Sequence, residues 1–327
     1  MTISVVIPVY NAERFIRFAL DSVVHQTYSD WECICVDDGS TDGSGAILDE
    51  YAAKDARFRV VHQANGGEGA ARNAGMDLAT GAIVAFHDAD DVWHPETLRL
   101  IAATREATGA DVIRYGWKHV SAHEGGFEPL PAGACGRIVD LKARTESTIR
   151  FCALGAATAV ARAACGDIRF SSLTQGADLV YVLDCLLRSG KVAMIEAPLL
   201  HYLTHPGQIS RRVTRALLEG SCRYLPEIAA RCARIGEGAA AAAADTRRYV
   251  SDLMFRRLAG SWRLLEDMSE REAVRRAFWT ALRRLAELAD FFSPCRRRAV
   301  LLACRRESVL LLNLFVVLPY RLERKMV

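Results

Sequence analysis

The sequence predicts an α/β protein with a mixed, mostly parallel β-sheet, helices on both faces, and a helical C-terminal region. Apolar runs typical of buried strands alternate with helical patterns over residues 3–115, which favours parallel strands joined by helices. Beyond residue 211 helical patterns dominate, and arginine is almost the only base. The chain has 327 residues, 51% hydrophobic and 25% charged. It can therefore bury a large core, unlike a disordered or collagen-like chain.

The expected elements alternate between strands and helices. Residues 3–9 (Ile-Ser-Val-Val-Ile-Pro-Val) are a β-branched apolar run, as in a strand buried on both faces. Residues 12–26 place apolar side chains at helical spacing. Ser40 or Thr41 is expected to cap a helix that runs to Tyr51. The other expected strands are 31–36, 58–62, 82–86 and 112–115, and the other expected helices are 70–79 and 95–108.

Polar residues follow these strands at or beyond their carboxyl ends. Asn11 follows the first strand, Asp37-Asp38 the second, residues 65–72 the third, and residues 88–91 the fourth. In open α/β sheets, ligands bind at the carboxyl ends of the strands. The sequence therefore predicts a binding site along one edge of the sheet.

The segment Asp88-Ala89-Asp90-Asp91 offers three carboxylates directly after a buried strand. Asp88 and Asp90 share one side if the segment is extended. Carboxylate oxygens suit Mg²⁺ or Mn²⁺, which usually bind one or two carboxylates together with substrate phosphates. The alternative interpretation is a solvated acidic loop.

A glycine-rich segment precedes Arg72, at residues 65–69. It is neither a P-loop, since no Gly-Lys-Ser/Thr follows, nor a good dinucleotide fingerprint. A glycine turn at a helix N-terminus, with Arg72 one turn further on, would favour a diphosphate. The alternative is an ordinary loop with a surface arginine.

The histidines and cysteines predict neither a zinc site nor a disulfide framework. His201 and His205 are four residues apart, but Pro206 interrupts a helix and no third ligand is evident. The ten cysteines are scattered without a CxxC pair, and Cys33 and Cys35 lie in an apolar run. We expect them to be core residues of a protein in the reducing cytoplasm.

Several sequence blocks within residues 3–95 form a recognisable series. They are residues 5–11 (VVIPVYN), 26–32 (QTYSDWE), 36–42 (VDDGSTD), 65–67 (NGG) with 71–75 (ARNAG), and 88–93 (DADDVW). Weaker blocks follow at 176–179, 198–202 and 207–210. In order and spacing the series resembles the family 2 glycosyltransferases, which have the Rossmann-type GT-A fold.

The resemblance implies a nucleotide-diphosphate sugar, typically a UDP-sugar, as donor. By its place in the blocks, Asp38 would hydrogen-bond the nucleobase, and Arg72 would face the base or the diphosphate. The remaining residues expected to bind the nucleotide sugar are Pro8, Tyr10, Asn11 and Asn65.

The resemblance also implies a Mn²⁺ or Mg²⁺ cofactor. Asp90 would ligate the metal, and Asp88 would hold the ribose or a water at the metal. Asp91 would be a supporting carboxylate. His205 is a further candidate at the metal or the diphosphate.

Family members usually invert the anomeric carbon, and a single displacement needs one base on the acceptor side. By resemblance this base is Asp178. Asp184 is a fallback, but the helical spacing of leucine and valine around it favours a structural role. Ala177 stands where the family often has glutamate, which keeps open an inactive nucleotide-sugar-binding partner of a synthase complex. A nucleotidyltransferase is a second alternative, although no lysine-rich triphosphate loop lies near the first strand.

Charge divides the chain into two parts. Residues 1–212 hold 20 Lys/Arg and 26 Asp/Glu, a balance of −6, whereas residues 213–327 hold 22 and 13, a balance of +9. The expected domains are a catalytic domain at 1–210, with a nucleotide-sugar half (1–110) and an acceptor half (111–210), and a basic helical region at 211–327.

The end of the chain is apolar and basic. Residues 308–320 would span about 20 Å as a helix, short of the roughly 30 Å hydrocarbon core. Residues 296–327 therefore favour an interfacial helix on an anionic cytoplasmic membrane face. The alternatives are a buried helix of a helical subdomain or a contact in a homodimer. Nucleic acid is not an expected partner, because the catalytic half is acidic and lacks interleaved basic and aromatic residues.

These features together predict a metal-dependent glycosyltransferase at the inner face of the cell membrane. Its acceptor would be a glycan or a lipid-linked molecule in the synthesis of a bacterial surface polysaccharide.

Overall fold

The chain divides into two compact units, Met1–Gln208 and Ile209–Val327. A computed structural model describes residues 1–122, 126–130, 134–139, 157–172, 177–189, 191–205 and 208, and isolated positions beyond residue 230. The expected helical region at 211–327, with its apolar end at 308–320, lies outside the described residues apart from those positions. Within the described part of the chain, no helix has the length and apolar character needed to cross a membrane.

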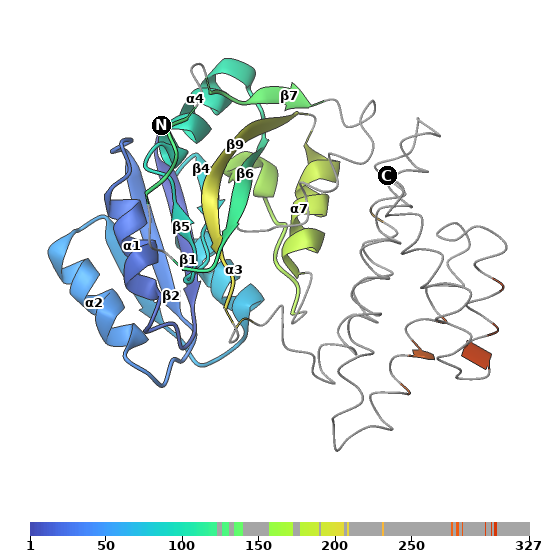
Figure 1. Ribbon diagram of the computed structural model, residues 1–327, viewed down its shortest axis with the longest axis horizontal. Helices are drawn as coiled ribbons and strands as arrows, with labels where there is room; N and C mark the ends of the chain where they lie inside the picture. The colour runs from blue at the N-terminus through green and yellow to red at the C-terminus, as the bar shows by residue number, and fades with distance from the viewer. Residues whose placement is uncertain are drawn as a thin grey trace. The chain divides into compact units, whose positions relative to one another are not determined.

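The first unit alternates strands and helices along the chain (Figure 1). Its strands are β1 (Ile3–Val9), β2 (Trp31–Asp37), β3 (Phe58–His62), β4 (Ile83–Phe86), β5 (Val92–Trp93), β6 (Val112–Val120), β7 (Arg137–Val139), β8 (Thr158–Ala161) and β9 (Val192–Leu203). Its helices are α1 (Ile16–Val24), α2 (Ser44–Lys54), α3 (Glu68–Leu78), α4 (Thr97–Thr108), α6 (Arg162–Cys165) and α7 (Ala177–Arg188).

The strands form one mixed sheet in the order β3-β2-β1-β4-β8-β6-β9-β5, with β7 paired to β9. The half built from β3, β2, β1 and β4 is parallel. Strand β8 runs antiparallel between β4 and β6, and β6 is parallel to β9. The mixed α/β fold predicted from the sequence is confirmed.

Strand β1 lies at the centre of the parallel half, between β2 and β4. Its Ile, Val and Ser side chains are buried on both faces, as its uninterrupted apolar run predicts. Pro8 lacks a backbone N–H, but the ladder with β4 ends at Val6. The proline therefore lies where β4 needs no donor, which is how a central strand accommodates it.

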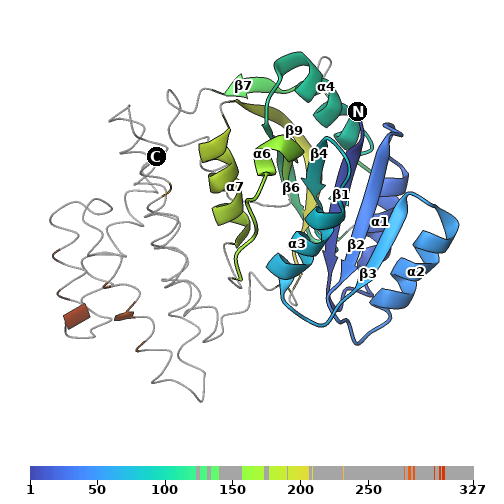
Figure 2. The same cartoon turned by 180° about the vertical axis from the view of Figure 1, so that it is seen from behind.

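Helices cover both faces of the sheet (Figures 1 and 2). One face packs Ile3, Val5 and Ile7 against apolar residues of α1, α2 and α4 in a single core cluster. On the other face α3 approaches β1 so closely that a Cβ on Gly75 would come within 2.4 Å of a Val6 methyl group. The aromatic ring of Phe86 in β4 contacts Tyr181 of α7 on this second face.

Some element boundaries differ from the sequence prediction. Helix α2 begins at Ser44, so the predicted cap at Ser40 or Thr41 is wrong. The backbone N–H of Ser40 is bound instead by Asp37, and that of Thr41 by Asn11. These bonds hold the chain in a loop before the helix starts. Strand β6 continues to Val120 because its extension pairs with β9.

Candidate active site

The ends of the parallel strands bring the predicted polar residues to one edge of the sheet. Val9 at the end of β1 is in register with Asp37 at the end of β2. The end of β4, Phe86, is in register with Val6 of β1. Loops after all three strands therefore leave the sheet at the same edge, as the sequence predicts.

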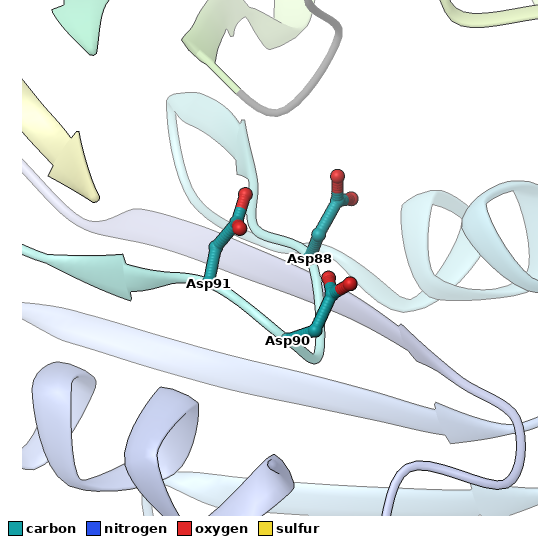
Figure 3. Close-up of side chains that lie close together, drawn as sticks. All are labelled: Asp88, Asp90 and Asp91. Atoms are coloured by element: carbon teal, nitrogen blue, oxygen red, sulfur yellow. The ribbon is translucent and has the colours of Figure 1, made fainter. Parts of the chain in front are cut away.

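Asp88, Asp90 and Asp91 form a carboxylate cluster after β4, with one oxygen of each within 4.8 Å of the others (Figure 3). The segment is not extended: Ala89 and Asp90 form a turn, and the N–H of Asp91 donates to the Asp88 carbonyl. The side-chain alternation of an extended segment, which would put Asp88 and Asp90 on the same side, therefore does not apply here. The turn brings Asp91, expected only to support the site, into the cluster itself.

Asp91 is the completely buried member of the cluster. Its Oδ1 accepts a hydrogen bond from the backbone N–H of Leu203 at 3.0 Å. Its Oδ2 is buried without a hydrogen-bond partner among the described residues. Burial raises the pKa of Asp91 well above its usual value, and the charges of Asp88 and Asp90 add to the shift.

Three neighbouring carboxylates, one with a buried unpartnered oxygen, are a donor set that fits a hard divalent cation. Burial also raises the pKa of Asp88 to about 7, although Arg72 opposes this shift. A cation would relieve the mutual repulsion and bind the free oxygen of Asp91. The residues present therefore fit Mn²⁺ or Mg²⁺.

His205 reaches the cluster from the segment after β9. Its Nε2 lies 3.1 Å from Oδ2 of Asp90, and its ring lies 4.5 Å from that of Phe15, centroid to centroid. His201, by contrast, lies within β9 rather than on a helix with His205. The structure thus brings His205 to the predicted metal residues.

Arg72 of α3 faces the carboxylates from the neighbouring helix. Its guanidinium, only 3% exposed, lies 2.7 Å from both Glu68 and Asp88. Burial disfavours the charge, but Glu68, Asp88 and Asp178 raise the pKa of Arg72 above its usual value. Arg72 is thus a fixed positive charge beside the cluster.

Asp38 organises the glycine-rich loop. Its Oδ1 accepts hydrogen bonds from Gln63 Nε2 at 2.7 Å and from Gly66 N at 2.8 Å, and its Oδ2 accepts one from Gly67 N at 2.8 Å. The side chain is buried, whereas Asn65 on this loop is exposed. The structure thus shows Asp38 holding the loop, and its contact with a nucleobase stays a prediction.

The loop after β1 carries the other predicted nucleotide residues. Asn11 adopts a left-handed backbone conformation with φ of 51°, which asparagine tolerates better than most residues. Its Oδ1 accepts from Thr41 N at 2.8 Å and so joins the loops after β1 and β2. Tyr10 is 51% exposed beside it, and Pro8 is half-buried in β1.

Asp178 lies in the first turn of α7 and is half-buried. Its charge contributes to the raised pKa of Arg72, after those of Glu68 and Asp88. Asp184 is also half-buried, further along α7. Gly176 of the same sequence block lies outside the described residues.

The sequence alone did not single out three residues that the structure places here. Glu68 pairs with Arg72, and Gln63 pairs with Asp38. Asn73 binds the backbone of Phe170. The i,i+4 spacing of Glu68 and Arg72 was a usable signal, whereas the Asn73 contact joins segments that are distant in the sequence.

Comparison with known proteins identifies the domain. Residues 4–164 match the family model of glycosyl transferase family 2. The uncharacterized glycosyltransferase EpsJ of Bacillus subtilis is 38% identical over 144 residues, 44% of this chain and 42% of EpsJ. The putative teichuronic acid biosynthesis glycosyltransferase TuaG of the same organism is 43% identical over 97 residues, 29% of this chain and 38% of TuaG. The chain thus matches less than half the length of each.

Solved structures share the fold. S. aureus TarS 1–349 in complex with UDP-GlcNAc has a TM-score of 0.69 at 22% identity, covering 94% of this chain and 88% of TarS 1–349. The mannosyltransferase PcManGT from Pyrobaculum calidifontis, in complex with GDP-Man and Mn²⁺, has a TM-score of 0.53 at 17% identity, covering 99% of this chain and 83% of PcManGT. Residues 4–164 are therefore a domain of glycosyl transferase family 2, in a unit with the GT-A fold.

Proposed function

We propose that this chain transfers a sugar from a nucleotide-diphosphate sugar to a hydroxyl group, with inversion at the anomeric carbon. One observation carries the proposal: the carboxylate cluster of Asp88, Asp90 and Asp91 adjoins the buried cation Arg72 at the edge where β1, β2 and β4 end. A diphosphate with a divalent cation is the ligand that complements this pairing of charges.

Asp90, Asp91 and Asp88 would hold Mn²⁺ or Mg²⁺, with His205 beside Asp90. When bound, the ion supplies positive charge that stabilises the departing diphosphate. Arg72 adds a second positive charge and needs no rearrangement, because Glu68 and Asp88 already hold the guanidinium in place. Such preorganised charge is an effective way to stabilise a leaving group.

Asp178 would act as general base from the acceptor side. The acceptor oxygen forms a bond to the anomeric carbon while the bond from that carbon to the diphosphate oxygen breaks. The acceptor proton moves to Asp178, and the nucleoside diphosphate leaves with the bonding electron pair. A single displacement of this kind inverts the anomeric carbon and needs only one base.

The loops after β1 and β2 would bind the nucleoside. Asn11 joins these two loops through its hydrogen bond from Thr41 N, and Asp38 joins the loop after β2 to the glycine-rich loop after β3. The exposed ring of Tyr10 is free to stack on a base. Pro8 and Asn65 complete the proposed pocket. The complexes of TarS with UDP and with UDP-GlcNAc support a uridine donor.

The acceptor is proposed to be a glycan or a lipid-linked molecule in cell-surface polysaccharide synthesis. The relatives named for teichuronic acid biosynthesis and as a poly(ribitol-phosphate) beta-glucosyltransferase support this class. A lipid-linked acceptor would be held at the membrane, so we propose that the enzyme works at its inner face.

The decisive experiment measures product release from UDP-GlcNAc, UDP-glucose and GDP-mannose with Mn²⁺, before and after chelation with EDTA. We expect release of the nucleoside diphosphate from one donor, and loss of activity with Asp90→Ala and Asp178→Asn. Asp184→Asn, on the same helix as Asp178, is the matched control and should stay active. Release of pyrophosphate would favour a nucleotidyltransferase, and UDP binding without turnover would favour an inactive binding partner.

Membrane contact is proposed for residues 296–327, on the basis of their apolar and basic sequence. In a flotation assay, full-length protein should bind vesicles that contain anionic lipid, and a chain ending at residue 295 should not. Full-length protein that stays unbound would remove this proposal. Size-exclusion chromatography with light scattering would show whether the same segment instead joins a homodimer.

A further inference from the structure

Asn73 of α3 binds the backbone of a segment that lies far away in the sequence. Its Oδ1 accepts a hydrogen bond from Phe170 N at 2.8 Å, and its Nδ2 donates one to Phe170 O at 2.9 Å. The side chain therefore satisfies both backbone polar groups of Phe170, as a neighbouring strand would. The chemistry proposed above gives Asn73 no part.

Gly69, one turn earlier in α3, allows this segment to approach the helix closely. A Cβ at this position would lie 2.6 Å from the carbonyl oxygen of Ser171. No side chain fits there unless the backbone moves. Gly69 and Asn73 thus place residues 170 and 171 directly against α3. We call this contact of Gly69 and Asn73 with residues 170 and 171 the clamp.

The ring of Phe170 links this clamp to α7. It stacks on Tyr181 at a centroid distance of 4.0 Å and an interplanar angle of 10°. Phe86 packs edge-on against both rings, at 5.1 and 5.4 Å. Tyr181 is buried and follows Asp178 by three residues in α7, so the two lie on neighbouring positions of one helix face.

The clamp also adjoins the donor side of the site. Arg72, next to Asn73 in α3, has its guanidinium carbon 5.3 Å from the centre of the Phe170 ring. Arg72 itself pairs with Asp88. A single helix therefore presents Arg72 to the carboxylate cluster and Asn73 to the segment that anchors the helix of Asp178.

We propose that Asn73 is a positioning residue that sets Asp178 relative to Arg72 and the donor, through Phe170 and Tyr181. The inference rests on the proposed function, which makes Asp178 the base. A base must lie within hydrogen-bond reach of the acceptor hydroxyl, and a displacement of about 1 Å can cost about 100-fold in rate. Loss of the clamp therefore lowers kcat and leaves nucleotide binding intact.

Two substitutions remove the clamp in different ways. Asn73→Ala deletes both hydrogen bonds. Asn73→Asp keeps the size of the side chain and the acceptor for Phe170 N, but it places a carboxylate oxygen against Phe170 O. Asp77→Ala is the matched control, because Asp77 ties the same helix to the neighbouring Arg169 through an exposed ion pair at 2.9 Å.

The first measurement uses full-length protein with Mn²⁺, UDP as binding probe and the donor that the wild type turns over. We expect both Asn73 variants to lose about 10- to 100-fold in kcat, with the Kd for UDP within about twofold of wild type. Asp77→Ala should match the wild type in both. Unchanged kcat, an equal loss with Asp77→Ala, or a parallel loss of UDP affinity would overturn the inference.

The second measurement is amide hydrogen exchange, which requires no turnover. Peptides that cover residues 168–186 should exchange faster in both Asn73 variants, whereas peptides from β1 and β4 should be unaffected. Unchanged exchange over residues 168–186 would refute the clamp even in an active enzyme. A wild type that releases no nucleoside diphosphate would refute the proposed function instead, so the two failures are distinguishable.

Discussion

Arg72 donates a hydrogen bond to Asp88 over 2.7 Å from a side chain that is only 3% exposed. This buried cation pairs directly with one carboxylate of the cluster. Its partner Glu68 is 48% exposed and can be solvated without it. Asp88 therefore depends on Arg72 for its counter-charge much more than Glu68 does.

Arg72→Met should destabilise the metal-free protein by about 3 kcal/mol, because it leaves the cluster without its buried cation. Glu68→Gln removes only the exposed half of the network and should cost less than about 1 kcal/mol. Urea unfolding in EDTA compares the two variants with wild type. Equal losses of stability in the two variants would show that the Arg72–Asp88 pair contributes no more than the Arg72–Glu68 pair.

Asp91→Asn should separate stability from metal binding. The amide keeps an acceptor for Leu203 N–H and replaces a carboxyl group whose charged form is disfavoured by burial and by the charges of Asp88 and Asp90. Without metal, the free energy of unfolding should therefore rise by about 1–2 kcal/mol.

Mn²⁺ affinity should fall at least about tenfold in the same variant, because one anionic ligand is lost. Thermal unfolding with and without Mn²⁺ measures both effects, since a ligand that binds the native state raises the midpoint. A variant that is less stable without metal, or that binds Mn²⁺ as the wild type does, would contradict this assignment of Asp91.

The parallel strands were predictable because the apolar sequence pattern of each strand lies within the strand itself. The run from Ile3 to Val9 is apolar on both faces, and β1 has those bounds. The sequence does not predict strand β8, because two of the four residues in Thr158–Ala161 are alanines, which have low strand propensity. Strand β4 is equally short, but its sequence is Ile-Val-Ala-Phe. Helix α2 began later than predicted because hydrogen bonds from Asn11 and Asp37 hold the preceding loop.

The candidate site was predictable only in part, because sequence patterns report only on residues that are close together along the chain. Residues that follow a strand can be assigned to its carboxyl end, and Asp88 and Asp90 were found in that way. The pairing of His205 with Asp90 joins residues 115 positions apart, and no periodicity reports such a contact. The resemblance to a family, rather than any pattern, suggested His205.

Gly75→Ala should destabilise the protein although alanine is the better helix former. The new Cβ would lie 2.4 Å from a Val6 methyl group in the central strand. Overpacking of this kind costs about 1–3 kcal/mol, which exceeds the gain of about 1 kcal/mol in helix propensity.

Val6→Ala is the second substitution in a double-mutant cycle with Gly75→Ala. The two substitutions should be non-additive, with the double variant more stable than the sum of the single losses predicts. Denaturant unfolding of all four proteins gives the coupling. Additive losses would show that α3 does not press on Val6.

His62 should make stability depend on pH near neutrality. Its Nδ1 lies 2.9 Å from Asp37 and its Nε2 lies 3.1 Å from Asp49. The bond with Asp37, and then that with Asp49, raises the pKa of His62 above its ordinary value of 6.5. Protonated His62 is therefore favoured in the folded state, so its contribution is complete below pH 6.5 and is lost as pH rises through the folded pKa.

The size of this effect is limited, because the His62 side chain is 49% exposed. Solvent screening keeps the expected contribution below about 1 kcal/mol. Unfolding of wild type and His62→Gln between pH 5.5 and 8.5, values chosen to bracket the ordinary pKa of about 6.5, tests the sign. The stability difference should be largest at the acidic end and shrink toward the basic end, and Asp49→Asn should reduce it. A difference that grows with pH would mean that folding lowers the pKa of His62, against the geometry of its two carboxylates.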